Sequence, residues 1–268
     1  MKLMGGSRKY WYLFRLKLME YLTFPLDFLA NWASFPFTMI VYYFLYNTVY
    51  EFNPSFANMT LPTLMVYFFF TLCFRRMGNH SGIANDVNED IQKGRFLSYI
   101  TRPMHYIGYS FAIKSSTVVV QALMALPFII IVPYLVIPQY TLDVTTLLQA
   151  YFLALLGFGV TFQIYYMVGL LTFWFEAIWG IRHTIGLMVW LFSGAIVPIS
   201  ILPTFLQGTA LLLPFQHQAG IPAQLLLGQK TTGDFILSTI ILTGWIIGLF
   251  IIQRYVWKKG LQKHDGKG

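Results

Sequence analysis

Long apolar runs alternate with short polar stretches along this chain. Six windows are apolar over most of the roughly twenty residues that a helix needs to cross the hydrocarbon core of a bilayer. They cover residues 27–48, 61–74, 107–137, 147–173, 184–201 and 235–255. The second window is short, so we expect its helix to begin earlier, at Phe56 or Met59. Runs of this length exceed a barrel strand of about ten residues, so the pattern predicts an all-α integral membrane protein with six transmembrane helices.

The composition supports a membrane protein. Hydrophobic residues make up 57% of the chain and charged residues only 10%, whereas a soluble domain carries roughly a quarter charged residues. The single cysteine, Cys73, excludes an intramolecular disulfide framework. The first twenty residues lack the unbroken apolar stretch of a secretory signal, so we expect no cleavage. No repeat or linker divides the sequence, so we expect one transmembrane domain over residues 1–268.

Lys and Arg residues alternate between the two sides of the predicted spans. The N-terminal segment, the loop after the second span and the C-terminal tail each carry five, whereas the loops after the first and third spans carry none. Basic residues favour the cytoplasmic side, so both termini and the loop at residues 75–106 are predicted to be cytoplasmic. This arrangement also accounts for the net charge of +8, so nucleic acid is not needed as a partner.

Two short amphipathic segments lie outside the predicted spans. Residues 7–24 place five apolar side chains on one face at helical spacing, namely Trp11, Phe14, Leu18, Tyr21 and Leu22. This pattern predicts an interfacial helix, although a simple basic flank to the first span is an equal alternative. Residues 83–94 carry a narrow apolar stripe of Ile83, Val87 and Ile91, acidic residues at Asp86, Glu89 and Asp90, and Gly94 as the C-terminal cap. So short a helix needs support from the spans or from a partner, and the alternative is a solvated connector.

Two stretches carry a family resemblance. The segment IQKGRFLSYITRP, residues 91–103, joins the end of that helix to a Gly, an apolar cluster and a Pro before the next span. The segment GAIVPISILP, residues 194–203, is followed by LLLPF, which contains Pro214. With six spans and both termini inside, the chain resembles the type-2 ATP-binding-cassette exporter permeases. It departs from their pattern after Gly94, where Arg95, Phe96 and Leu97 replace the usual small and acidic residues.

The resemblance implies a transmembrane permease subunit of an ATP-driven exporter in a bacterial plasma membrane, surrounded by lipids. It would pair with a second permease subunit, as a homodimer or heterodimer, and with a separate ATPase that binds ATP and Mg. The chain itself is then no enzyme and binds no cofactor or metal. The sequence agrees, because it contains no G-x-x-x-x-G-K-[ST] phosphate loop. The candidate coupling residues toward the ATPase are Asp86, Val87, Glu89, Asp90, Ile91 and Gly94.

The region 201–228 is apolar but broken by Pro and Gly into pieces too short to span a membrane. Short re-entrant helices fit this pattern better than an interfacial loop. The resemblance assigns this outer segment to the cap of the pathway, with candidate residues Gly194, Pro198, Pro203 and Pro214.

Four polar residues within the predicted spans are candidates for an intramembrane role: Asp27, Lys114, Gln121 and Gln163. Asp27 and Lys114 could pair, but snorkelling to the interface is favoured. For the two glutamines, hydrogen bonding between helices is favoured over lining a pathway. Gly244 and Gly248 have the spacing of closely packed helices, and we expect them to serve packing within the subunit.

Other classes of protein fit less well. His183 and Ser193 could suggest an intramembrane protease, but ten residues of one helix separate them by about 15 Å. The five His residues and one Cys are scattered, so no metal site is expected. The main alternative is a secondary carrier or channel that works without an ATPase, although such proteins usually carry an ionisable relay near the middle of the bilayer.

Overall fold

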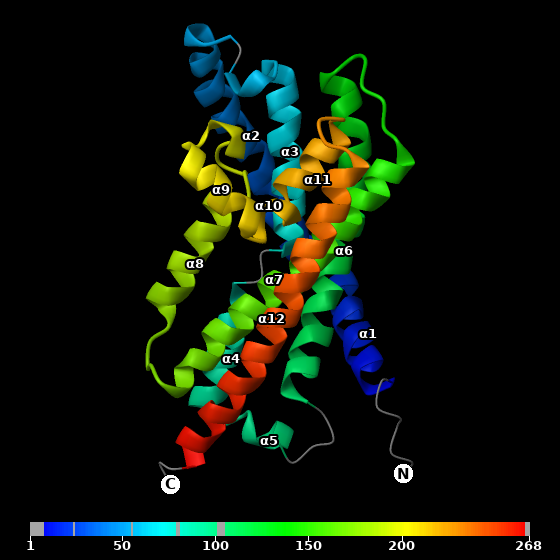
Figure 1. Cartoon of the computed structure of the whole chain (residues 1–268). Helices are drawn as coiled ribbons and strands as arrows, with labels where there is room; N and C mark the ends of the chain where they lie inside the picture. Colours follow the sequence, from blue (N-terminus) through cyan, green and yellow to red (C-terminus); the bar gives the residue numbers. More distant parts are fainter. Residues whose placement is uncertain (1–7, 24, 55, 79–80, 101–104, 266–268) are drawn as a thin grey trace.

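The computed structural model describes residues 8–23, 25–54, 56–78, 81–100 and 105–265. These residues are mostly helical and include no strand, as the sequence predicts, and they form an elongated bundle (Figure 1). The α-helices are α1 (Arg8–Thr23), α2 (Pro25–Phe52), α3 (Leu61–Gly78), α4 (Gly82–Gln92), α5 (Leu97–Ile100), α6 (Tyr106–Val136), α7 (Val144–Leu170), α8 (Trp179–Phe192), α9 (Thr204–Leu212), α10 (Phe215–Gln218), α11 (Gly220–Leu226) and α12 (Thr232–Asp265). Three short 3-10 helices are η1 (Phe56–Asn58), η2 (Leu171–Phe173) and η3 (Ile199–Ile201).

Each of the six predicted windows coincides with a helix, but two boundaries are wrong. α3 begins at Leu61 and not at Phe56 or Met59, because the separate turn η1 contains Ala57 in the left-handed region, at φ 58°. α8 begins at Trp179 and ends at Phe192, well before residue 201. The chain turns there through Gly194, which has a φ of 79°.

Three of the described helices are long and apolar enough to cross a membrane, namely Tyr106–Val136, Val144–Phe173 and Thr232–Lys263. α8 has 14 residues and is therefore about 21 Å long, which is shorter than a hydrocarbon core of about 30 Å. α3 has 18 residues and carries Arg75 and Arg76 in its last turn. Length and composition thus support half of the predicted spans, and the count of six stays a prediction.

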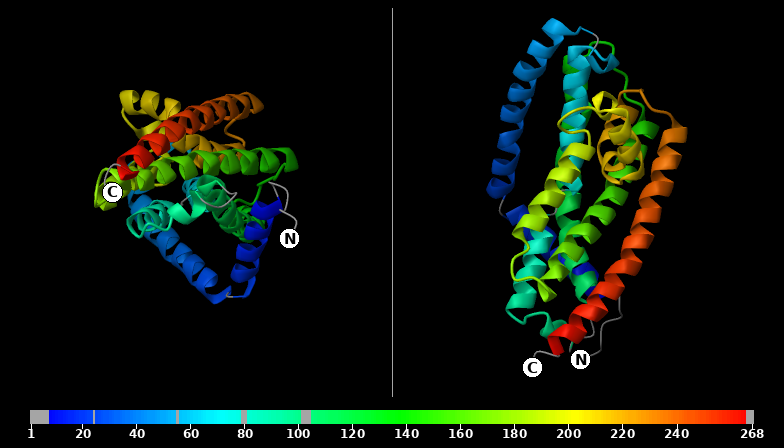
Figure 2. Two further views of the ribbon diagram at one scale, coloured as in Figure 1. Left: turned by 90° about the horizontal axis from the view of Figure 1, so that it is seen from below. Right: turned by 60° about the vertical axis from the view of Figure 1, so that its left-hand side comes forward.

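α7 lies at the centre of the bundle, where α3, α4, α11 and α12 pack against it (Figure 2). Half of its most apolar window is buried within the chain, against 22% for α6 and 17% for α12. Gly157 of α7 makes room for α10, because a Cβ at that position would lie only 2.3 Å from Cγ of Gln218. The other two long helices therefore leave most of their apolar surface to their surroundings.

The region 201–228 forms the short helices α9, α10 and α11, as its broken pattern predicts, and α10 and α11 are buried in the bundle. Tyrosines of α2 support the non-helical chain before them. The Tyr42 hydroxyl donates to the carbonyl of Ala195 at 2.9 Å, and the Tyr46 hydroxyl donates to that of Ile196 at 2.6 Å. Backbone acceptors that no helix satisfies are thereby paired inside the protein.

One end of the molecule holds the start of α1, helix α4 and the end of α12 (Figure 1). α1 packs along α6, and the Tyr21 and Thr117 hydroxyls lie 2.8 Å apart. The helix predicted at residues 7–24 is therefore present, although Trp11 of its apolar face is 62% exposed. Its interfacial position stays a prediction.

Candidate functional site

α4 lies against α7 through the apolar stripe that the sequence predicts. Ile83 and Val87 are each 1% exposed and Ile91 is 7% exposed. The approach is close at Gly169 of α7, where a Cβ would lie 2.5 Å from Cβ of Val87 and 3.1 Å from the carbonyl oxygen of Ala84. α4 is thus seated on α7 at a position that has no room for a larger residue.

This packing corrects one part of the sequence interpretation. Val87 and Ile91 were expected to form the ridge that docks on a partner, but they are buried inside the chain because α7 already covers them. The exposed side chains of α4, and of Lys93 directly after it, are polar: Asn85, Asp86, Glu89, Gln92 and Lys93. Any partner of this helix therefore meets its polar face, and the apolar stripe fixes the helix to its own subunit.

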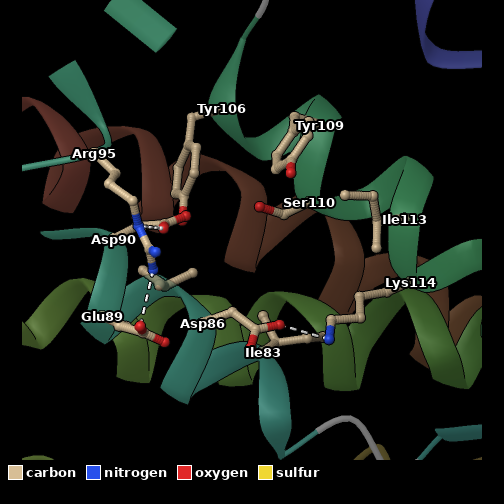
Figure 3. Close-up of a pocket in the computed structure, with 11 residues that line it drawn as sticks. Ile83, Asp86, Glu89, Asp90, Arg95, Tyr106, Tyr109, Ser110, Ile113 and Lys114 are labelled. Carbon is tan, nitrogen blue, oxygen red and sulfur yellow. Dashed lines mark hydrogen bonds and ion pairs between the residues drawn. The ribbon is translucent and has the colours of Figure 1, made fainter. Parts of the chain in front are cut away.

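An ion pair ties the polar face of α4 to α6. Nζ of Lys114 lies 2.6 Å from Oδ2 of Asp86, and both side chains line a cavity of about 340 Å³ between the helices (Figure 3). The sequence suggested Asp27 as a partner for Lys114, but the structure pairs Lys114 with Asp86. The side chain of Asp27 lies outside the described residues.

The acidic residues at the end of α4 hold the turn that follows it. Asp90 accepts hydrogen bonds from Nε of Arg95 at 2.8 Å and from the Tyr106 hydroxyl at 2.7 Å (Figure 3). Glu89 pairs with Lys93 and Arg95. The hydrogen bond and charge of Lys93, followed by the charge of Arg95, hold the pKa of the Glu89 carboxyl below its usual range. Sequence reasoning missed the role of Tyr106.

Gly94 ends α4 as predicted. Its φ of 65° lies in the left-handed region, and its N–H donates to the carbonyl of Ile91 at 3.1 Å. The reversed chain buries Phe96 completely, with its ring edge-on to Phe173 after α7 and to Trp257 of α12. The site therefore reaches α6 through Lys114, α7 through its apolar stripe, and α12 through Phe96.

The other candidate residues lie apart from this site. Gln163 donates to the carbonyl of Gly159 in its own helix at 3.4 Å, and Oε1 of both Gln121 and Gln163 is buried without a hydrogen-bond partner among the described residues. The predicted hydrogen bonds between helices are thus not found for these two residues in the part of the chain that the structure describes. Gly244 also differs from expectation, because among the described residues nothing beyond its own helix backbone and chain neighbours lies within 4 Å of a Cβ placed there.

The outer candidates occupy the opposite end of the bundle from α4, around α9 and α10 (Figure 1). Gly194 lets the Tyr67 hydroxyl approach, since a Cβ there would lie 2.3 Å from that oxygen. Pro198, Pro203 and Pro214 directly precede η3, α9 and α10 respectively. These residues shape the broken segment, and none of them contributes to the α4 site.

α4 thus combines a buried apolar stripe, an exposed polar face and links to three long helices. The model of a family described as ABC-2 family transporter protein matches residues 37–268. The chain belongs to the ABC-2 transporter family. A comparison of the chain with curated proteins found no match. An ABC-2 family member is a membrane transport component that is generally not catalytic itself and generally associates with ABC ATPases, which agrees with the expected permease.

Proposed function

We propose that this chain is the permease subunit of an ATP-driven exporter, in which it forms half of the translocation pathway and is driven through α4 by a separate ATPase. The observation that carries the proposal is the two-sided character of α4. Its apolar side is buried on α7, while Asn85, Glu89, Gln92 and Lys93 remain exposed at the end of the molecule where α12 also ends. A helix held this firmly moves with the helices behind it.

The contacts of α4 suggest how force would pass through the subunit. Pressure on the polar face reaches α7 through Val87, which has no free space before Gly169. The same displacement pulls α6 through the Asp86–Lys114 ion pair and α12 through Phe96 and Trp257. Packed helices switch between discrete arrangements rather than deforming continuously, so a small push at α4 would become a rigid-body rotation.

The rest of the proposal follows from the sequence and the family. ATP and Mg would bind to the ATPase, because the chain contains no phosphate loop. A second permease subunit would complete the pathway, as a homodimer or heterodimer. The basic residues that favour the cytoplasm and the shared position of α4 and the end of α12 support a bacterial plasma membrane protein with α4 and both termini inside.

Site-specific cross-linking tests the proposal. Glu89→Cys in a Cys73→Ala background should form a cross-link to the co-expressed ATPase, either as a disulfide or through a short bifunctional reagent. Thr141→Cys is the matched control and should give none, because Thr141 belongs to the loop between α6 and α7, at the opposite end of the bundle (Figure 1). The purified chain alone should not hydrolyse ATP. Transport by the chain alone in liposomes under an ion gradient, with no cross-link at Glu89, would instead support a secondary carrier or channel.

A further inference from the structure

A second cavity, of about 320 Å³, lies between the last turn of α3, the C-terminal part of α7 and helix α8, whose lining residues run from Arg182 to Trp190. Basic residues from two helices line it: Arg75 from α3, and Arg182 and His183 from α8. Ser81 and Tyr165 add hydroxyl groups. No carboxylate occurs among the described lining residues, so the charge of this cavity is of one sign.

The described residues offer neither arginine an acidic partner in this cavity. Nε of Arg75 and Nε of Arg182 are both buried without a hydrogen-bond partner among the described residues. The Arg75 guanidinium lies over the Trp190 ring, 5.5 Å from its centroid. Arg76, the next residue, is different: it donates to Oγ of Ser34 at 2.9 Å and lies over Trp32. Both arginines are part-buried with a fully buried Nε, and such cations of like charge around one cavity are unfavourable unless an anion joins them.

The position of Arg182 adds to this imbalance. It lies in the first turn of α8, where the partial positive charge of the helix end disfavours a cation and favours an anion. The N-cap residue, Ile178, provides no side-chain hydrogen bond to the first turn. The helix end and the two guanidiniums therefore all favour the same kind of ligand.

We propose that this cavity binds a phosphate group. Guanidinium groups match phosphate oxygens in pairs, and two of them from different helices can hold one phosphate from two sides. The volume is at the lower limit of small-molecule pockets and suits one headgroup phosphate. An apolar part of the wall reaches the surface of the chain, since the lining residue Leu187 is 52% exposed. A phosphate on an acyl-chain carrier, such as an anionic lipid, thus fits both parts of the site.

The test uses the full chain purified in a neutral detergent. Binding is measured by thermophoresis with a short-chain phosphatidic acid, a short-chain phosphatidylcholine and inorganic phosphate as separate probes. We expect saturable binding of phosphatidic acid, weakened at least about tenfold by Arg75→Gln and by Arg182→Gln because charge-assisted hydrogen bonds are lost. Arg76→Gln is the matched control and should bind as the wild type does, since Arg76 has its own partners outside the cavity.

A further variant protects the test against misfolding. Gly186→Glu places a carboxylate one turn after Arg182, and there is room for it because a Cβ at Gly186 lies 3.6 Å from the Tyr165 hydroxyl. This internal anion should raise the melting temperature and abolish phosphate binding. Inorganic phosphate that binds with the same dependence on both arginines would identify free phosphate as the source, and binding of phosphatidic acid alone would identify a lipid headgroup. No saturable binding by the wild type, or equal binding by Arg75→Gln and Arg182→Gln, would overturn the proposal.

Discussion

Asp86 and Lys114 lie on different helices and form an ion pair, with 2.6 Å between Oδ2 and Nζ. Asp86 is on the polar face of α4, and Lys114 is about two turns into α6, so the pair joins the exposed helix to one of the longest helices of the bundle. The side chains are 59% and 23% exposed, so solvent screens the pair and its contribution to stability is below about 1 kcal/mol. Its main effect is to fix where α6 lies relative to α4.

Charge reversal tests whether this pair transmits motion. Asp86→Lys and Lys114→Asp should each lower the melting temperature only slightly but reduce the amount of transport per ATP hydrolysed by the complex. The double exchange should restore both, because it rebuilds the pair with reversed polarity. Lys17→Gln is the control: it removes an exposed ion pair within α1, to Glu20, and should leave the coupling ratio unchanged. Equal coupling in all these variants would argue against a role for the pair.

Gly169→Ala should separate α4 from α7. The new Cβ would meet Cβ of Val87 at 2.5 Å, which side-chain rotation cannot relieve because both atoms are fixed to the backbone. We expect destabilisation of about 1–3 kcal/mol, as for other overpacked cores. Gly244→Ala on α12 is the matched control, since nothing lies within 4 Å of its Cβ and alanine favours a helix. Thermal unfolding in detergent distinguishes the two variants.

Val87→Asp should damage the subunit itself and not merely its contact with an ATPase. Val87 is 1% exposed, and an unpaired carboxylate at that position would cost several kcal/mol. We expect loss of monodisperse protein on gel filtration even without the ATPase. Asn85→Asp adds the same charge to the exposed face of α4 and should fold normally. A monodisperse Val87→Asp chain would contradict the packing of α4 on α7.

The sequence shows which helices form more clearly than it shows what they touch. The four-residue spacing of Ile83, Val87 and Ile91 predicts a stripe on α4, but the spacing does not reveal whether α7 or another protein covers it. Depth in the predicted spans suggested Asp27 as a partner for Lys114, whereas the structure pairs Lys114 with Asp86. Such choices depend on how helices pack in three dimensions, which periodicity along one helix does not contain.

Aromatic residues show the same limit. The tyrosines near the end of α2 are typical of a membrane interface, yet the hydroxyls of Tyr42 and Tyr46 hold carbonyls about 150 residues away in the sequence. The early end of α8 has a local cause that could be anticipated, because Gly194 adopts a left-handed conformation that stops a helix. Local backbone signals were thus more informative than side-chain chemistry.

The orientation of the chain gives the last prediction. Cysteines introduced singly into a Cys73→Ala background at Thr141 and Gln229 should react with an impermeant maleimide in intact cells, because both residues are exposed and lie in loops predicted to be outside. Cysteines at Asn85 and Gln262 should react only after permeabilisation. Cys73 is fully buried, so the unmodified chain should show almost no labelling and serves as the blank. Labelling of Asn85→Cys in intact cells would place α4 outside, away from any cytoplasmic ATPase. That result would reject the proposed coupling but leave the phosphate cavity to be judged by its own variants.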